Sequence, residues 1–484
     1  MLRQKHKENY AVVENEAFNG CTALTTIEGN VVEVYDSAFK GCTSLASFDA
    51  FRNLTEARLS AFANTGFTEL VLPDSLVTIG NSVFSGCKKL TSVTLSNSVV
   101  NYGSSVFGSC TALTQVTFGS NMAFVPMQMF SGCTALESIV IPDGVTTICK
   151  EAFKDCKALT SVTIPDSVKT IEDGAFKGCI KLATINLPTT LTSLGEEVFS
   201  GCSVLNNVVI PTGITLINER LFYNCKALET LVISDNATLE ASFNAKYSKP
   251  TLKTVKIGKG AIGDSAFSNC TNLTTVELGN GVTSIGTSAF LKCTQLSSIA
   301  IGSGVISIGT SAFSGCTALT NANIGSGAIG ESAFNGCTKL ANVTLGNGVT
   351  SIGRNAFLKC KALTSMYIGS SVKTIESYAF FGCEALEEVT ISAAQIGNQA
   401  FRSANALKKV TLGDGVEAIP AGAFSSCGMG NKNNSPELYL KAGTWTSNGQ
   451  KTIVAEGAAI TTVNPVFNQI KSGKPANWSG PANP

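Results

Sequence analysis

The stretch AFKDCKALTSVTIPDSVKTIEDGAF, residues 152–176, contains one complete unit of a pattern that runs through most of the chain. Its two Ala-Phe pairs end at Phe153 and Phe176, which mark the start of successive units. Phenylalanine recurs at this phase at residues 18, 39, 62, 84, 107, 130, 153, 176, 199, 222, 243, 267, 290, 313, 334, 357, 380, 401 and 424. A fixed period of about 20–30 residues is typical of a solenoid, in which one turn cannot bury its apolar face alone. The phenylalanines therefore predict a solenoid of about nineteen turns.

Each unit contains two extended segments and a turn. The segment 159–164 alternates at its end between polar and apolar residues, as a half-buried strand does. Pro165-Asp166 is expected to reverse the chain, as Gly279-Asn280 is in later units, and Val168–Ile171 gives a shorter second strand. The small residues around Ala175-Phe176 favour one helical turn or a 3₁₀ segment. We therefore expect parallel strand ladders with one phenylalanine in each layer of the core.

The consensus L-x-x-V-x-I-P-x-x-V-x-x-I-G-x-x-A-F-x-x-C resembles the BspA-like, or Treponema pallidum-type, class of leucine-rich repeats. It recurs from Ala17 to about Cys427, and so covers most of the chain. The resemblance implies a curved, β-rich (α/β-type) leucine-rich-repeat solenoid with parallel strands. It also implies extracellular display in many relatives, a role in adhesion or host-protein binding, and no enzyme activity.

Irregular units and a change in turn residues predict how the array is divided. The units that begin at Phe62 and Phe243 lack the usual cysteine; turns before Phe243 favour proline, whereas later turns favour glycine. In the later part, GAIGDSAF (260–267) returns as GAIGESAF (327–334), so a block of three turns is expected to be duplicated. We expect a lead-in over 1–16, a first half of the array over 17–242, a second half over 243–429, cap strands over 430–470 and a flexible tail over 471–484.

Composition excludes partners that are chosen by bulk charge. Lys plus Arg (35) nearly equals Asp plus Glu (34), so no single-sign field exists to attract nucleic acid or an anionic membrane. The sequence contains no run of about eighteen apolar residues, the length that is needed to span a bilayer. The first seven residues, MLRQKHK, contain no apolar core of a secretion signal. The chain is therefore expected to be cytoplasmic, or else to lack its export signal. A monomer is expected as well.

Cysteine occurs seventeen times, and its spacing argues against a disulfide or metal framework. Sixteen cysteines lie three residues after a repeat phenylalanine, from Cys21 to Cys427, with no C-x-x-C pair and with His6 as the one histidine. Layers about 4.8 Å apart would allow disulfides between neighbours. However, every side chain of such a column points towards the core, where a free cysteine acts as a small hydrophobe. We predict buried free thiols, with occasional disulfides and metal binding as alternatives; Cys149, at a position where other units have glycine, is expected nearer the surface.

The sequence contains little evidence for a catalytic or cofactor-binding site. The strings 258–263 and 325–330 satisfy G-x-G-x-x-G, but a dinucleotide site also needs a long helix facing the pyrophosphate. A short strand is expected there instead. His6 lies before the repeats, and neither G-x-S-x-G nor H-E-x-x-H is present. We therefore expect no catalytic residues, no cofactor and no metal.

A binding face is the positive prediction. In-register strands place equivalent residues in columns, and one outward column contains Thr94, Thr117, Val140, Thr163, Asn186, Val209, Val232, Lys256, Glu277, Ala300, Asn323, Thr344, Tyr367, Thr390 and Thr411. Most of these are ordinary strand residues. Apolar, aromatic or charged side chains that interrupt the threonines and asparagines of this column are candidate partner-binding residues, together with neighbours from the adjacent column. The candidates are Val209, Val232, Lys256, Glu277, Tyr367, Glu388 and Lys409.

Two functions remain open on the sequence alone. The first is a cell-surface or secreted adhesin that binds a protein or glycan along this face. The second is an intracellular protein-interaction scaffold, which the many free thiols and the lack of a signal sequence favour.

Overall fold

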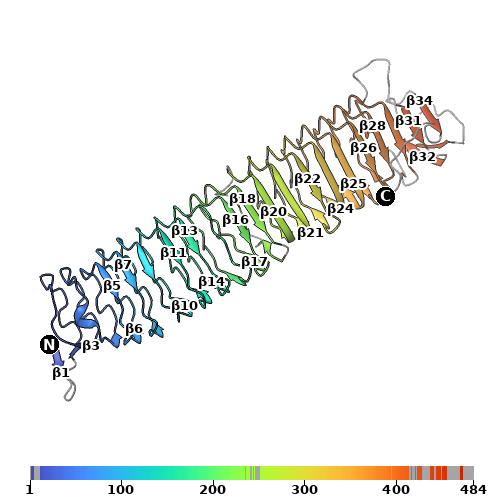
Figure 1. Cartoon of the computed structure of the whole chain (residues 1–484). Helices are drawn as coiled ribbons and strands as arrows, with labels where there is room; N and C mark the ends of the chain where they lie inside the picture. Colours follow the sequence, from blue (N-terminus) through green and yellow to red (C-terminus); the bar gives the residue numbers. More distant parts are fainter. Residues whose placement is uncertain are drawn as a thin grey trace. The chain divides into compact units, whose positions relative to one another are not determined.

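The fold is taken from a computed structural model, which describes residues 2–4, 11–234, 236–239, 243, 245, 251–393, 395–413, 416, 420, 422–427, 437–440, 443–447, 450–454 and 469–472. It divides into two compact units, Met1–Ala237 (unit 1) and Thr238–Pro484 (unit 2). Both are built from β-strands in stacked coils, about seventeen in all (Figure 1). The expected number of nineteen is therefore too high.

Unit 1 consists of short strands in two ladders. Its elements are β1 (Leu2–Gln4), β2 (Ala11–Val13), β3 (Val31–Val34), the 3₁₀ helix η1 (Asp49–Phe51), β4 (Glu56–Ala57), β5 (Glu69–Val71), β6 (Thr78–Ile79), β7 (Ser92–Thr94), β8 (Asn101–Tyr102), β9 (Gln115–Thr117), β10 (Phe124–Val125), β11 (Ser138–Val140), β12 (Thr147–Ile148), β13 (Ser161–Thr163), β14 (Thr170–Ile171), β15 (Ser193–Leu194), β16 (Asn207–Ile210), β17 (Leu216–Ile217) and β18 (Thr230–Ile233). The first ladder contains β5-β7-β9, β11-β13 and β16-β18; the second contains β2-β3-β4-β6-β8 and β10-β12-β14-β15. These pairings are parallel, and β1 adds to β2 in the antiparallel sense. Because β2 is already part of a ladder, the array begins inside the expected lead-in.

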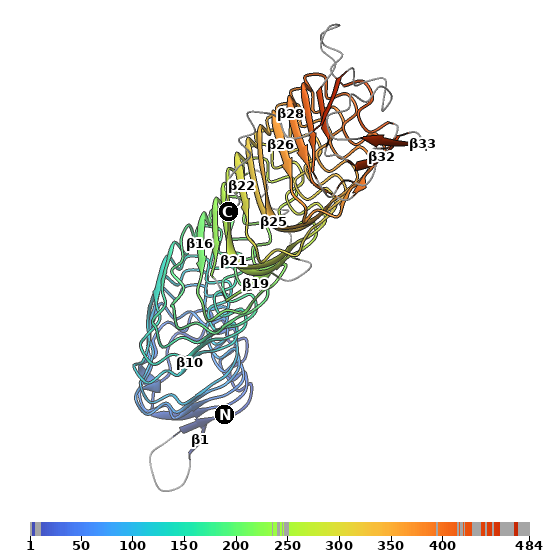
Figure 2. The ribbon, with the colours of Figure 1, turned by 90° about the vertical axis from the view of Figure 1, so that its right-hand side faces the viewer.

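Unit 2 has longer strands. Its elements are β19 (Thr238–Leu239), β20 (Thr254–Ile262), β21 (Thr275–Ile285), β22 (Ser298–Ile301), β23 (Ser307–Ile308), β24 (Asn321–Ile329), β25 (Asn342–Ile352), β26 (Ser365–Ile368), β27 (Thr374–Ile375), β28 (Glu388–Ile391), β29 (Gln395–Ile396), β30 (Lys409–Leu412), β31 (Glu437–Leu440), β32 (Gly443–Ser447), β33 (Gln450–Val454) and β34 (Gln469–Ser472). Figure 2 shows β22, β26 and β28 following one another along one side of this unit. The elements β20 to β23 return with the same lengths as β24 to β27, in agreement with the duplicated block seen in the sequence.

The glycine-containing units do not all reverse the chain as expected. Gly279-Asn280 lies inside the eleven-residue strand β21, which joins what are two strands in unit 1. The turn at Pro165, by contrast, is closed by a hydrogen bond of 3.1 Å from Val168 N to Pro165 O. Proline has no N–H for the ladder and fixes its φ, whereas Gly279 leaves the backbone free to stay extended. The chain bends at register shifts in the β20–β21 pairing instead of turning.

The phenylalanines form a column inside each unit. The rings of Phe153 and Phe176 have centroids 5.5 Å apart and are inclined by only 3°. In unit 2 the rings of Phe334 and Phe357 stack at 5.2 Å and 3°. All four side chains are fully buried, and each coil adds buried leucine, valine or isoleucine beside its phenylalanine. Each coil therefore supplies part of the apolar surroundings of the next.

The segments around these phenylalanines are hydrogen-bonded turns rather than helical segments. Only η1 is helical among the described residues, so the expected 3₁₀ or helical turn in every coil was wrong. The reason is the backbone on either side of the phenylalanine. Glu151 and Asp155, which flank Phe153, have φ of 54° and 57°, in the left-handed region that a right-handed helix cannot use. The Phe153 N–H instead donates to Ala175 O of the next coil at 2.8 Å.

The C-terminal end contains more strands than the one or two expected. β31 continues the parallel ladder from β30, β34 pairs with β31, and β32 and β33 form an antiparallel hairpin. Lys471 and Ser472, assigned to the flexible tail, belong to β34; residues 473–484 of that tail lie outside the described part, as does His6. No described helix is long and apolar enough to cross a membrane.

Candidate functional site

The outward column of the first ladder in unit 1 contains exposed apolar side chains. Val209 of β16 lies opposite Val232 of β18 in register, as the sequence predicted. Val209 is 60% exposed and Val232 is half-buried. Val140 of β11 and Val71 of β5 are 65% and 71% exposed. Val71 was missed because the predicted column began at Thr94; extending the register by one more coil would have found it, since it pairs with Thr94.

The candidates in unit 2 form two separate groups. Lys256 and Glu277 lie opposite one another, with Nζ and Oε2 2.8 Å apart, so these charges are largely paired. Glu388 and Lys409 pair in the same way at 3.8 Å.

Tyr367 is 40% exposed and lies in the column beside these two, opposite Thr390. Thr411, which was expected to face outward, is buried at the point where β31 extends the ladder. The seven predicted residues therefore do not make one continuous patch.

A hollow of about 680 Å³ opens in unit 1 near the start of the first ladder. It is lined by Ala46, Ser47, Phe48, Asp49, Arg52, Thr68, Glu69, Val71, Pro73 and Asp74. The coil that contains η1 has no strand at this place in the first ladder, which leaves β5 with one open edge. Asp49 accepts bonds from Ser47 Oγ at 2.7 Å and from Arg52 Nη2 at 2.5 Å, so the charged groups at its rim are partly paired with each other.

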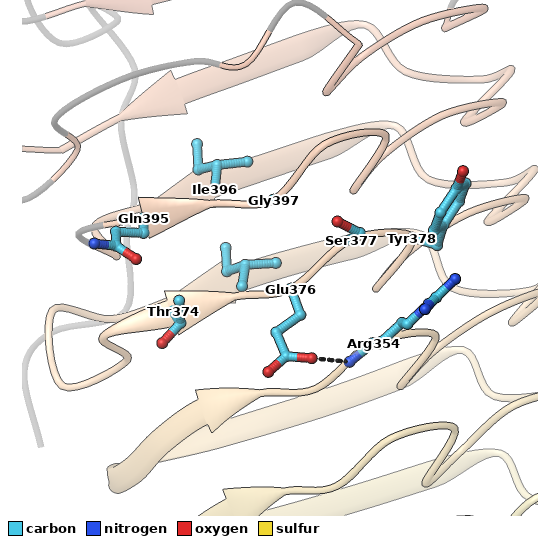
Figure 3. A pocket seen from close by; sticks show the side chains of 9 residues that line it. Arg354, Thr374, Glu376, Ser377, Tyr378, Gln395, Ile396 and Gly397 are labelled. Atoms are coloured by element: carbon cyan, nitrogen blue, oxygen red, sulfur yellow. Dashed lines mark hydrogen bonds between the residues drawn. The ribbon is translucent and has the colours of Figure 1, made fainter.

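A second hollow, of about 460 Å³, lies in unit 2 at β27 and β29 and the residues that follow these strands (Figure 3). It is lined by Arg354, Thr374, Ile375, Glu376, Ser377, Tyr378, Gln395, Ile396 and Gly397. None of these residues was singled out from the sequence. Their only signal is that Glu376 and Tyr378 replace the small residues found at the same positions in most other coils.

Comparison with known proteins agrees with this architecture. The model of the BspA type leucine rich repeat region matches in six copies, over residues 11–137, 123–247, 240–328 and 325–430. The chain belongs to this BspA-type leucine-rich-repeat family. No curated protein matches it.

Three solved structures illustrate the likeness. A leucine-rich repeat protein from Bacteroides ovatus is 29% identical, with 72% of this chain and 87% of that chain covered and a TM-score of 0.46. A leucine rich cell surface protein from Faecalibacterium prausnitzii is 23% identical, with 88% and 92% covered and a TM-score of 0.32. The T. pallidum leucine rich repeat protein is 21% identical, with 52% and 78% covered and a TM-score of 0.23.

Membership of the BspA-type leucine-rich-repeat family points to a protein-binding role, because family members are typically binding proteins without enzyme activity. The two G-x-G-x-x-G strings of this family member lie within and just after β20 and β24, and no helix follows either of them. The described residues contain no group of three or more histidine, cysteine or acidic side chains that could hold a metal.

The cysteines of the BspA-type repeats form a column of free thiols beside the phenylalanines. Cys156 Sγ donates to Phe130 O of the preceding coil at 3.2 Å, and the same bond recurs through both units. Burial raises the pKa of Cys133 and Cys202 to about 12. Because the thiolate is the nucleophile and metal ligand, these thiols are structural. All seventeen are free, Cys21 is exposed and Cys149 is half-buried.

We expect this burial to control thiol reactivity. In the folded protein at pH 8, Ellman's reagent should react promptly with Cys21 alone of the seventeen cysteines. Cys149 should react slowly, because burial and the nearby Glu172 charge raise its pKa to about 11. All seventeen should react after unfolding in guanidinium chloride. Prompt reaction of several equivalents without denaturant would show that the column is not buried.

Proposed function

We propose that the chain binds a protein partner along the outward face of the first strand ladder in unit 1. The observation that supports this most is the row of valines in one outward column, Val71, Val140 and Val209, each at least 60% exposed. Threonine or asparagine would satisfy the strand at these positions, as they do in the coils between. Exposed apolar groups among polar ones on a rigid surface are typical of protein interfaces.

We further propose that this binding serves adhesion at the cell surface or outside the cell. Membership of the BspA-type family supports this proposal. The near-neutral composition also supports it, because attraction by bulk charge cannot supply the specificity. The alternative is an intracellular scaffold, which the unpaired thiols favour. Fractionation of cells that express the natural gene product distinguishes the two, since the adhesin must reach the surface or the medium.

The binding face can be tested with charge substitutions. The full chain is first screened on printed protein and glycan arrays, and the strongest protein ligand is then titrated against Val209→Asp and Val232→Asp. We expect each to weaken binding by about tenfold or more, because a carboxylate in an apolar contact must be desolvated without a partner. Tyr367→Ala tests whether the group in unit 2 contributes.

The matched control is Val100→Asp, since Val100 is 66% exposed but precedes β8 in the second ladder. Its affinity should stay within about twofold of the parent, and all variants should melt like the parent. Unchanged binding in Val209→Asp and Val232→Asp would remove this face from consideration. Loss of binding in Val100→Asp alone would assign the interface to the other ladder.

A further inference from the structure

The hollow at β27 and β29 has an apolar floor and a polar rim. Ile375 and Ile396 are buried beneath it, while Thr374, Gln395 and Ser377 line its mouth (Figure 3). The side chains of these three polar residues make no hydrogen bond with any described residue. Their hydroxyl and amide groups are therefore free to bind a ligand that offers both donors and acceptors.

Glu376 has a structural role that limits what the hollow can bind. Its Oε2 accepts a bond of 2.9 Å from Arg354 N, the dashed line in Figure 3. Glu172 makes the same contact in unit 1, accepting from Lys150 N at 2.8 Å. This hydrogen bond is therefore a feature of the repeat and does not by itself indicate a ligand. What distinguishes the coil in unit 2 is the residue two positions further on, which is Tyr378 instead of Gly174.

Tyr378 has a backbone conformation that tyrosine disfavours. Its φ is 62°, in the left-handed region that is costly for a bulky residue. Most equivalent positions in other coils are filled by serine, asparagine, glutamine, glutamate or glycine. Tyr378 is not part of the buried core, and its ring contacts only Phe381 and Arg354 among the ring and cation contacts of the described residues. An aromatic side chain held in an unfavourable conformation at the rim of a hollow points to a binding role.

Cations and aromatic rings alternate beside the hollow. The Arg354 guanidinium lies 5.9 Å from the Tyr378 ring centroid, and the Tyr378 ring meets Phe381 edge-on at 6.0 Å. Arg402 lies 5.8 Å from the Phe381 ring. Arg354 and the exposed Lys373 form no ion pair with any described residue. Glu376, already bound to Arg354 N, is the one carboxylate in the lining, so an anionic ligand is favoured over a cationic one.

We propose that this hollow binds a carboxylated sugar residue of an acidic glycan. The Arg354 guanidinium pairs with the sugar carboxylate in the fork geometry that arginine offers. The face of Tyr378 packs against the C–H groups of the pyranose ring. Thr374 and Gln395, which lie on the other side of Glu376 from Arg354 and Tyr378 (Figure 3), bond the hydroxyls of an adjoining sugar residue. A volume of about 460 Å³ fits one or two sugar residues better than a folded partner, so this site is separate from the protein-binding face proposed above.

The test uses trigalacturonate, a trisaccharide of carboxylated sugars, and its carboxyl-reduced neutral counterpart. Isothermal titration calorimetry on the full chain should detect trigalacturonate at concentrations up to about 10 mM and at least about tenfold weaker binding of the neutral sugar. Arg354→Ala and Tyr378→Asn should each weaken binding about tenfold. Asparagine is chosen because it tolerates the left-handed backbone.

Two further variants test the effect of the Glu376 charge and the role of the aromatic ring. Glu376→Gln should strengthen binding about two- to fivefold, because it removes the repelling charge while its amide oxygen can still accept from Arg354 N. Lys150→Ala, at the same place in a coil that has no aromatic ring, should leave binding unchanged.

Melting curves establish that each variant is folded. Three results would overturn the proposal: no binding of trigalacturonate by the parent, equal binding of the neutral sugar, or unchanged binding in folded Arg354→Ala. A hexapeptide of aspartate that binds more tightly than the sugar, with the same dependence on Arg354, would assign the hollow to acidic peptides instead.

Discussion

Phe153→Ala is expected to lower the free energy of unfolding of unit 1 by about 3–5 kcal/mol. Phe153 is fully buried, and its ring stacks on Phe130 at 5.6 Å and on Phe176 at 5.5 Å. Removing the ring takes away apolar burial and leaves a cavity open to both neighbours. Because each coil depends on the next, the loss should spread along the stack. Denaturant unfolding followed by circular dichroism measures it.

Phe153→Leu is the matched control, because it keeps most of the apolar volume and should cost about 1.5 kcal/mol or less. Hydrogen exchange on the same variants locates the effect. Amides in the coils next to Phe153 should lose protection before those in unit 2 do. A Phe153→Ala protein that unfolds like the parent, with unchanged exchange near β13, would contradict the stacked core.

Alkaline pH should destabilise the protein steeply between about pH 9 and pH 12. Burial raises the pKa of Cys133, Cys202 and Cys383 from 9.0 to about 12. In this window the unfolded chain has lost these protons while the folded chain still holds them, so unfolding is favoured by about 1.4 kcal/mol per thiol for each pH unit. At pH 10 the three thiols together remove about 4 kcal/mol. Their contribution to stability is fully present below pH 9.

The slope of stability against pH separates the thiols from other groups that titrate in this range. Cys133→Ala, Cys202→Ala and Cys383→Ala, combined in one protein, should make the slope shallower by about three protons. The matched control is Cys21→Ala, which removes an exposed thiol and should leave the slope unchanged. If the triple variant and the parent lose stability in parallel from pH 9 to 12, these thiols are not protected by the fold.

The fold could be predicted from the sequence because the same positions of the repeat are apolar in each unit and buried in each coil. Phe153, Cys156 and Leu159 are fully buried, and the same positions are buried in coil after coil. The register of Val209 with Val232 follows from the same period. Local backbone geometry could not be predicted in this way. The left-handed φ of Glu151 follows from no side-chain preference for that conformation, whereas the glycine, asparagine or aspartate at most positions equivalent to Asp155 could have indicated it.

The candidate site was less predictable, because a column shows which side chains face outward but not which of them pair or surround a hollow. Lys256 and Glu277 stood out in the sequence as charges, yet the structure pairs them at 2.8 Å. The hollow beside Arg354 and Tyr378 depends on three successive coils. The sequence shows that Tyr378 replaces a small residue of the repeat, but only the structure shows that it lies beside Arg354 at the rim of a hollow.

A double-mutant cycle on the phenylalanine column tests the stacking of equivalent side chains most directly. The coupling energy between Phe153→Ala and Phe176→Ala, whose rings touch, should be about 0.5–1.5 kcal/mol. Phe153→Ala and Phe62→Ala, which lie four coils apart in the same unit, should be additive within about 0.5 kcal/mol. Additivity in the adjacent pair, or equal coupling in both pairs, would contradict a core in which each coil packs on the next.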